Sequence, residues 1–331
     1  MSQLFSPLTL RSVTLPNRIA VSPMCQYSVT AEDGVPTDWH LVHLGSRAVG
    51  GAGLVIAEAT AVEARGRISP QDTGIWNDEQ VEAWKRITAF IKEHGAVPGI
   101  QLAHAGRKAV GDWTPVAPTT EPFPGLNTPE KLEHHSGIVK AFVDGALRAL
   151  EAGFEVLEIH AAHGYLLHEY YSPLTNEGST EERIAVPVEV TAAVRAAVGP
   201  DVPVLVRISG TDWEPGGWTA DDSVVLAQAL KAAGADLIDV SSGGNTAQAE
   251  IPIGPGYQVP LAEAVRRKAD VPTGAVGLIT EAKQAEQVVA DGSADLVLLG
   301  RELLRDPYWP LHAAQQLGAE VRAPEQYARA F

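Results

Sequence analysis

The sequence predicts a single domain with the (β/α)8 TIM-barrel fold, covering residues 1–331. Eight short apolar segments suited to buried strands recur along the chain, and Ala-rich helical segments separate most of them. The length also suits a barrel that carries insertions. An open, doubly wound sheet is the alternative, but such sheets usually show a Gly-rich fingerprint after the first strand. Here the sequence SPMCQYS stands in that place.

Each element has a local signature in the sequence. The expected strands are 18–23, 54–60, 97–104, 156–160, 202–209, 237–242, 273–278 and 296–301. The expected helices are 78–94, 136–152, 187–198, 221–233, 261–269 and 281–291, and glycine marks several of their exits. Residues 2–17 carry apolar runs broken by Pro7 and Pro16, which predict an N-terminal β-hairpin that caps the barrel.

Charge and composition restrict the possible partners. Lys and Arg number 25 against 41 Asp and Glu, so the net charge of −16 disfavours nucleic acid and anionic membranes as partners. Cys25 is the only cysteine, which excludes a disulfide framework and indicates a reducing compartment. The N-terminus lacks a signal-peptide core, and no apolar run reaches the ~20 residues that a membrane span requires. We therefore expect a soluble, cytoplasmic protein.

The barrel prediction identifies where a site should lie. Active sites of these barrels lie at the carboxyl ends of the strands. In this sequence polar residues stand at nearly every expected strand end, in an otherwise apolar barrel. This pattern indicates a binding mouth rather than a purely structural barrel.

The stretch EVLEIHAAHGYLLHEYYSPLTN has the densest set of functional side chains. It begins as a strand and then presents His160, His163 and Tyr165 within six residues. If a turn through Ala161 and Ala162 brings the two imidazoles together, both can donate hydrogen bonds to a carbonyl oxygen and the phenol can give up a proton. Two alternatives are a metal-binding histidine pair and a structural role in the core. No second cluster of cysteines or carboxylates completes a metal site, so no metal is expected.

Other strand ends suggest a phosphate and a planar ring. Ser242 and Gly243 follow the sixth strand, Gly277 follows the seventh, and Gly300 and Arg301 follow the eighth. Loops after the last two strands of such barrels often bind phosphate, although tight turns alone also require glycine. Gln101 and Arg207 suit the donors and acceptors of a heteroaromatic ring. For Arg207 the alternative is an internal ion pair with Glu58 or Asp239, and for Cys25 it is an inert core filler.

The chain resembles the Old Yellow Enzyme family of flavin-dependent ene-reductases, in particular its thermophilic-like bacterial class. The motifs that carry the resemblance span nearly the whole chain: SPMCQYS, QLAHAGRK, EIHAAHGYLLHEYYSPLTN, PGYQVP, GAVGLIT and LLGRELLRDPYWP. The resemblance implies a non-covalent FMN at the barrel mouth and NADPH as the reductant. It implies that the FMN is contacted by Pro23, Met24, Cys25, Ala59, Gln101, Arg207, Ser242, Gly243, Gly277, Gly300 and Arg301.

The resemblance also implies a reaction and further site residues. An activated C=C bond of an α,β-unsaturated carbonyl compound would receive a hydride from the flavin at its β-carbon, and Tyr165 would protonate the α-carbon. His160 and His163 would bind the carbonyl oxygen, and Cys25 would tune the flavin. Tyr27 and Lys108 would contact the substrate. Arg329 would reach the neighbouring active site in a homodimer or homotetramer.

Two mouth loops depart from the family pattern. The segments after HAGRKA and after SPLTN are shorter than expected, and Glu182 stands where the family usually has asparagine. Either these loops are truly shorter in this protein, or disordered loop residues are omitted from the sequence and the numbering runs on without them. A non-redox phosphate-binding barrel, an isomerase or a lyase, is the alternative function.

Overall fold

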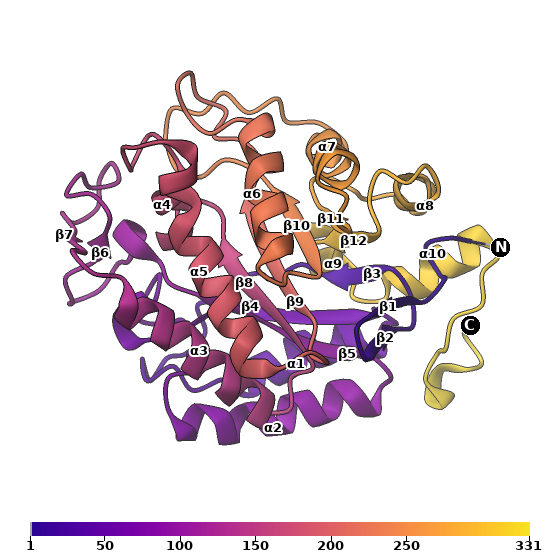
Figure 1. Ribbon diagram of the computed structural model, residues 1–331. Helices are drawn as coiled ribbons and strands as arrows, with labels where there is room; N and C mark the ends of the chain where they lie inside the picture. Colours follow the sequence, from indigo (N-terminus) through magenta and orange to yellow (C-terminus); the bar gives the residue numbers. More distant parts are fainter. Residues whose placement is uncertain (1) are drawn as a thin grey trace.

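The computed structural model describes residues 2–331, and its centre is a closed barrel of parallel strands (Figure 1). The barrel order is β3-β4-β5-β8-β9-β10-β11-β12, and every neighbouring pair is parallel. The strands are β3 Ile19–Val21, β4 Leu54–Ala61, β5 Val97–Ala103, β8 Val156–Ala161, β9 Val204–Ser209, β10 Leu237–Ser241, β11 Thr273–Ala275 and β12 Leu296–Leu299. The predicted (β/α)8 barrel is confirmed.

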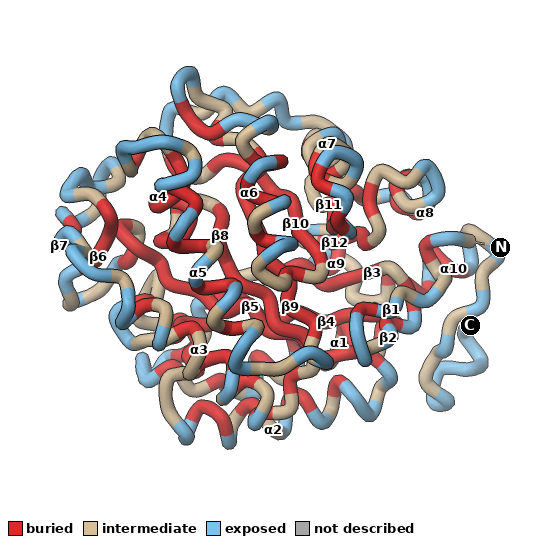
Figure 2. Tube along the Cα trace, in the orientation of Figure 1, coloured by how far each residue is buried: buried red, intermediate tan, exposed pale blue. Residues whose placement is uncertain are grey.

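Helices surround the barrel and bury the outer faces of its strands (Figures 1 and 2). They are α1 Asp38–Val49, α2 Asp78–Glu93, α3 Ser136–Glu151, α4 Leu166–Tyr171, α5 Thr180–Val198, α6 Ala220–Ala232, α7 Val259–Ala269, α8 Ala282–Ala290, α9 Arg301–Arg305 and α10 Trp309–Leu317. The sequence did not single out α1, because its buried face carries His40, His43 and Arg47. Those polar residues interrupt the apolar period by which helices are recognised.

Helix α5 begins seven positions before the start that Pro187 suggested. Its N-cap is Ser179, whose hydroxyl accepts the Glu182 N–H at 3.3 Å, while Glu182 Oε2 accepts the Ser179 N–H at 2.7 Å. This reciprocal capping box satisfies two amide groups that a helix start otherwise leaves unpaired. Pro187 lies inside the helix, where a proline is usually disfavoured. The unusual Glu182 therefore has a structural explanation at this helix end.

The barrel interior is filled by apolar side chains and closed at its amino-terminal end. Leu54, Leu205, Leu237 and Leu296 belong to one buried cluster inside the barrel. The hairpin of β1 (Leu8–Leu10) and β2 (Val13–Leu15) contributes Leu10 and Leu15 to the same cluster. The predicted hairpin cap is thus confirmed, and it leaves the opposite, carboxyl end of the barrel as the mouth.

The mouth loops are compact. The β5–α3 connection contains only the two-residue strands β6 (Val116–Ala117) and β7 (Glu130–Lys131), with the short helix η2 (Gly106–Lys108) before them. Residues 172–179 connect α4 directly to the capping box of α5. Within residues 2–331, no helix is both long and apolar enough to cross a bilayer.

Removing the α5 cap should lower stability. We expect Ser179→Ala to reduce the free energy of unfolding by ~1 kcal/mol, because the Glu182 amide loses its acceptor. Thermal unfolding followed by circular dichroism measures the effect. Ser179→Asp, which keeps a capping oxygen, should unfold close to wild type; equal losses in both variants would contradict the role of the cap.

Candidate active site

The turn after β8 brings His160, His163 and Tyr165 together, as the sequence predicted. The His160 ring centroid lies 5.2 Å from that of His163 and 5.0 Å from that of Tyr165, in edge-to-face arrangements. His163 has a left-handed backbone with φ of 63°, which turns the chain back beside the strand. Tyr165 is the N-cap residue of α4, so the helix start fixes its position.

His160 is held as a neutral imidazole with its proton on Nε2. The Ala162 N–H donates to His160 Nδ1 at 3.2 Å, so Nδ1 is an acceptor and cannot carry the proton. Burial, followed by the positive charge of Arg207, lowers the pKa of His160 well below 6.5. Nε2–H has no partner among residues 2–331. It is therefore free to donate to a ligand in the mouth.

The same backbone contact recurs at three other buried histidines. His40, His104 and His168 each accept a backbone N–H at Nδ1, from Thr37, Gly106 and Gly164 respectively. Their Nε2 atoms face carboxylates: Glu58 at 3.1 Å, Glu63 at 2.9 Å and Asp212 at 2.9 Å. His160 shares the backbone contact but has no carboxylate opposite Nε2 in the described chain. This difference leaves the Nε2 atom of His160, alone in this set, without a carboxylate opposite it among residues 2–331.

His163 is anchored by two serines that the sequence analysis did not include. The backbone N–H of His163 donates to Ser209 Oγ at 2.9 Å, and the ring atom Nε2 lies 2.7 Å from Ser241 Oγ. Burial lowers the pKa of His163 well below 6.5, with a further contribution from Arg207. Neither serine could be recognised from the sequence, because the contacts join β9 and β10 to the turn after β8.

The loops after β8 and β10 lie backbone against backbone. A Cβ on Gly164 would lie 2.2 Å from the Gly244 carbonyl oxygen, and a Cβ on Gly244 would lie 2.6 Å from the His163 Cα. Only glycine fits at both positions, and both have positive φ. Lys108 Nζ joins the two loops by donating to the carbonyls of His163 and Gly244 at 2.9 and 2.8 Å.

Lys108 lies at the mouth, where the sequence placed it. Its ammonium group lies 5.3 Å from the Tyr165 ring centroid and 4.5 Å from that of Phe123. Burial lowers its pKa to about 8. Because two carbonyls already accept from Lys108, this residue organises the turn that carries His163 and Tyr165, and its contact with substrate stays a prediction.

His168 and Asp212 support the turn from behind and were missed by the sequence analysis. The Gly164 N–H donates to His168 Nδ1 at 2.9 Å, and Asp212 accepts from Ser172 Oγ at 2.6 Å and from the Trp218 N–H at 2.8 Å. Burial alone would raise the pKa of Asp212, but His168 and these donors lower it overall. The only signal in the sequence was the spacing of His168, four residues after Gly164 in HGYLLH.

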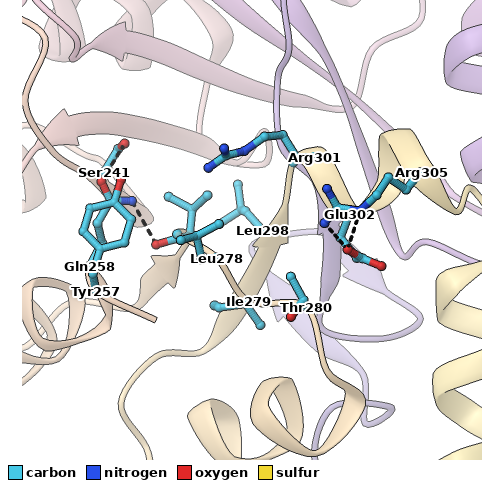
Figure 3. A pocket seen from close by; sticks show the side chains of 13 residues that line it. Ser241, Tyr257, Gln258, Leu278, Ile279, Thr280, Leu298, Arg301, Glu302 and Arg305 are labelled. Atoms are coloured by element: carbon cyan, nitrogen blue, oxygen red, sulfur yellow. Dashed lines mark hydrogen bonds and ion pairs between the residues drawn. The ribbon is translucent and has the colours of Figure 1, made fainter. Parts of the chain in front are cut away.

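A pocket of about 170 Å³ lies at the ends of the last strands (Figure 3). Gly277, Gly300 and Arg301 line it, as the phosphate prediction requires, together with Ser241 and Gln258. The Arg301 side chain extends into the pocket, whereas Arg305 pairs with Glu302. No carboxylate of residues 2–331 lies within ion-pairing distance of Arg301, so its guanidinium is available for an anion.

Ser242 and Gly243 lie beside this pocket. Ser242 Oγ donates to Gln258 Oε1 at 2.6 Å, and Gln258 Nε2 donates to the Val276 carbonyl at 2.9 Å. Gly243 has a positive φ of 67° and accepts from Ser209 Oγ at 2.8 Å through its carbonyl. Gln258 thereby ties the loop after β10 to the loop after β11, a contact that needs the three-dimensional structure to be seen.

Gln101 and Arg207 lie in the barrel interior just below the mouth. Gln101 Nε2 donates to Glu158 Oε1 at 2.8 Å, and Arg207 donates to Ser22 Oγ at 3.1 Å. Arg207 Nε also lies 3.1 Å from Asp239 Oδ2. The ion pair with Asp239, considered above as the alternative for Arg207, is therefore present; it leaves part of the guanidinium available for a ligand.

The segment after β3 is held by Glu58, which stands at a β-bulge between Ala57 and Ala59. Glu58 Oε2 accepts the Gln26 N–H at 2.8 Å. Pro23, Met24 and Cys25 are half-buried at this strand end, and Ala59 is buried beside them. Burial, with the nearby Asp72 and Glu58 carboxylates, raises the pKa of Cys25, so its thiol is protonated. Tyr27 is about half exposed, and its partial burial, followed by the nearby Cys25, raises its pKa.

Arg329 does not join the site of its own chain. It is exposed in the segment that follows η3 (Glu325–Tyr327), and the C-terminus lies beside α10, away from α4 (Figure 1). The structure thus separates Arg329 from the other predicted site residues. A role in a neighbouring subunit stays a prediction.

The mouth fits a phosphorylated planar cofactor. An unpaired guanidinium faces one pocket, glycines flank it, and buried hydrogen-bonding side chains lie at the centre of the barrel. Arg207 Nε faces Asp239 and Nη1 donates to Ser22 Oγ, which leaves the second terminal nitrogen of the guanidinium for a ligand. These features define a barrel that binds a flavin mononucleotide or a similar molecule.

Comparisons with known proteins agree with this class. A model of the NADH:flavin oxidoreductase / NADH oxidase family matches residues 3–320. An NADPH dehydrogenase of Geobacillus sp. (strain WCH70) is 50% identical over 339 positions, covering 100% of this chain and 99% of the relative. A morphinone reductase in complex with tetrahydroNAD has a TM-score of 0.82 at 28% identity, covering 98% of this chain and 93% of that one. TcOYE with pHBA has a TM-score of 0.84 at 26% identity, with 98% and 96% covered.

The chain belongs to the NADH:flavin oxidoreductase / NADH oxidase family, which confirms the Old Yellow Enzyme resemblance. It is an NAD(P)H-dependent flavin oxidoreductase with FMN as cofactor and NADPH as reductant. The non-redox isomerase or lyase is set aside on this finding. The alignment with the Geobacillus relative covers 339 positions against 331 residues here, so this chain lacks residues that its relative has.

The neutral state of His160 can be tested directly. We expect its ring to stay uncharged, with the proton on Nε2, down to well below pH 6.5, because burial and Arg207 disfavour the cation. Nitrogen-15 NMR of histidine-labelled protein reports both the charge and the tautomer, and His160→Gln assigns the signal. A ring that titrates near 6.5, or one protonated on Nδ1, would contradict the hydrogen-bond assignment.

Proposed function

We propose that the enzyme reduces the activated C=C bond of α,β-unsaturated carbonyl compounds. The observation that carries this proposal is the unpartnered Nε2–H of His160 beside the Tyr165 phenol, with ring centroids 5.0 Å apart. The first group can bind a carbonyl oxygen and the second can supply a proton. Reduction of a C=C–C=O unit needs both, a hydrogen-bond donor at the carbonyl oxygen and an acid at the α-carbon.

His160 and His163 hold and polarise the substrate carbonyl in this proposal. Because His160 is neutral, it stabilises negative charge on the oxygen as a hydrogen-bond donor and keeps its own proton. His163 helps to hold the same carbonyl oxygen in this proposal. Ser209 fixes its backbone and Ser241 fixes its ring. Bound FMN supplies the hydride, which the proposal directs to the β-carbon.

Tyr165 donates the proton to the α-carbon. Burial raises the pKa of its hydroxyl well above 10, so the phenol is fully protonated at neutral pH. A proton leaves such a group only when a strong base forms next to it, as the α-carbon becomes after hydride transfer. The Lys108 ammonium, 5.3 Å from the ring, lowers the cost of the transient phenolate.

The proposed cofactor contacts follow from the same geometry. Arg301 with Gly277, Gly300, Ser242 and Gly243 would hold the phosphate and ribityl chain, and Gln101 and Arg207 would contact the flavin ring. Pro23, Met24, Cys25 and Ala59 would line the ring at the end of β3 and β4, with Cys25 adjusting its potential. Tyr27 and Lys108 would meet the substrate.

Replacing the proton donor should slow one half of the reaction only. We expect Tyr165→Phe to reduce the rate of flavin reoxidation by 2-cyclohexenone by about 10²-fold or more, because the α-carbon loses its acid. Bleaching of the flavin by NADPH should keep its wild-type rate. Anaerobic stopped-flow absorbance separates the two steps.

Tyr170→Phe is the matched control, because this neighbouring tyrosine belongs to α4 but not to the cluster. It should reoxidise at the wild-type rate. If wild-type flavin is bleached by NADPH but no enone restores its colour, the proposed substrate class is wrong. If Tyr165→Phe reoxidises as fast as wild type, Tyr165 is not the donor.

We also propose that the chain forms a homo-oligomer in which Arg329 enters the active site of its neighbour. The exposed position of Arg329, remote from its own mouth, supports this arrangement. Mixed oligomers of Arg329→Ala and Tyr165→Phe chains should recover activity, because one site in a hybrid pair then has both residues intact. No recovery from subunits shown to exchange would contradict a contribution from the neighbour.

A further inference from the structure

Two carboxyl groups and one guanidinium are enclosed together inside the barrel, below the cofactor site. Glu158 and Asp239 are fully buried, and Arg207 is 5% exposed. They come from neighbouring strands β8, β10 and β9, in a register that sets Asp239 beside Arg207. With both carboxyls ionised, this cluster would carry an uncompensated negative charge in an environment that cannot solvate it.

The contacts within the cluster indicate how that charge can be removed. Glu158 and Asp239 contact each other through their carboxyl groups, and Arg207 Nε lies 3.1 Å from Asp239 Oδ2. No donor of the rest of the described chain forms a well-aligned hydrogen bond with Glu158 Oε2 or with either Asp239 oxygen, and Oδ2 has only the ion-pair contact with Arg207 Nε. A proton on Glu158 that points to Asp239 satisfies these atoms and leaves Asp239 as the counter-ion of Arg207.

Within residues 2–331, Arg207 is the only cation with a resolved effect on the pKa of either carboxyl group. The charges that act on Glu158 are those of Asp239 and Arg207, and those that act on Asp239 come from Arg207 and Glu158. Gln101 contacts the pair from β5, and neutral His160 stands two residues above Glu158. From β11 and β12 the nearby residues are Gly274 and Leu298. Leu205 and Leu237 belong to the apolar cluster below.

We propose that Glu158 and Asp239 hold one proton between them, and that this proton sets the charge and orientation of Gln101 and Arg207, the two side chains that hold the flavin ring. Gln101 donates through Nε2 to Glu158 Oε1, so its carbonyl oxygen is turned away from Glu158 as an acceptor for the ring. Arg207 faces one carboxylate instead of two. The inference depends on the proposed position of the ring, but not on the alkene chemistry.

The proton links the cluster to the redox state of the cofactor. With FMN bound, reduction by a hydride would add two electrons and one proton to the ring, and Arg207 would stabilise the resulting negative charge. Burial, followed by the charge of Asp239, raises the pKa of Glu158, whereas Arg207 lowers it. Once alkali removes the shared proton from the oxidised protein, reduction should draw it back from solvent. The uptake then becomes two protons per two electrons.

The test is the midpoint potential of the FMN-bound protein measured against pH. Wild type should show a break above neutral pH, where the slope changes from one proton to two protons per two electrons. Glu158→Gln should show no break, because its amide accepts from Gln101 and donates to Asp239 as the protonated acid does, but cannot titrate. A wild type without a break, or a variant that keeps it, would overturn the proposal.

Glu169→Gln is the matched control. Glu169 is equally buried, and burial raises its pKa to about 8, but its contacts are with Arg107 rather than with Gln101 or Arg207. This variant should keep the wild-type break. Loss of the break in Glu169→Gln would assign the effect to general burial of carboxyls and would refute the specific role of the pair.

A measurement on wild-type protein keeps the proposal testable if Glu158→Gln does not fold. Infrared difference spectra between the oxidised and reduced protein should contain the C=O band of a protonated carboxylic acid. Carbon-13 labelling of glutamate should shift this band, and labelling of aspartate should not. The absence of such a band, or its assignment to aspartate, would contradict a proton held on Glu158.

Discussion

The active site depends on one kind of contact, a backbone N–H donated to the Nδ1 atom of a buried histidine. Four histidines are fixed in this way, and in His40, His104 and His168 the other ring nitrogen faces a carboxylate. Those three brace the segments around the mouth. His160 has the same contact on one side and, among residues 2–331, no hydrogen-bond partner on the other. The fold thus prepares one neutral donor that only a ligand can satisfy.

The rest of the mouth is arranged to keep that donor in place. Gly164 and Gly244 allow two loops to approach each other, and Lys108 bridges their carbonyls. Ser241 couples His163 to the loop that borders the cofactor pocket. Below them Glu158 and Asp239 contact Gln101 and Arg207, the side chains proposed to contact the flavin ring. The residues proposed to bind substrate, donate the proton and bind the cofactor therefore share one connected set of contacts.

Much of the fold was predictable because its signals are local. The eight apolar segments mark the strands, and HAAHGY places His160, His163 and Tyr165 within one turn. Helix α1 was missed because buried His40, His43 and Arg47 disguise its apolar face, and the start of α5 was misplaced because Pro187 resembles a first-turn proline. The roles of Ser241, Gln258 and Asp212 could not be found, since each acts through residues distant in sequence. The HAAHGY motif identifies the side chains of the site. Contacts between residues distant in sequence decide which ring nitrogen of each histidine is protonated and how the side chains are oriented.

The most direct test of the account is to follow isotopes into the product of enone reduction. Reduction with NADPH deuterated at the transferable position should place deuterium at the β-carbon. Reduction with unlabelled NADPH in deuterated water should place it at the α-carbon, since the hydroxyl of Tyr165 exchanges with solvent. NMR of the saturated ketone locates both labels. Solvent deuterium at the β-carbon, or no saturated product from any enone, would contradict the proposal that the cofactor supplies the hydride and Tyr165 the proton.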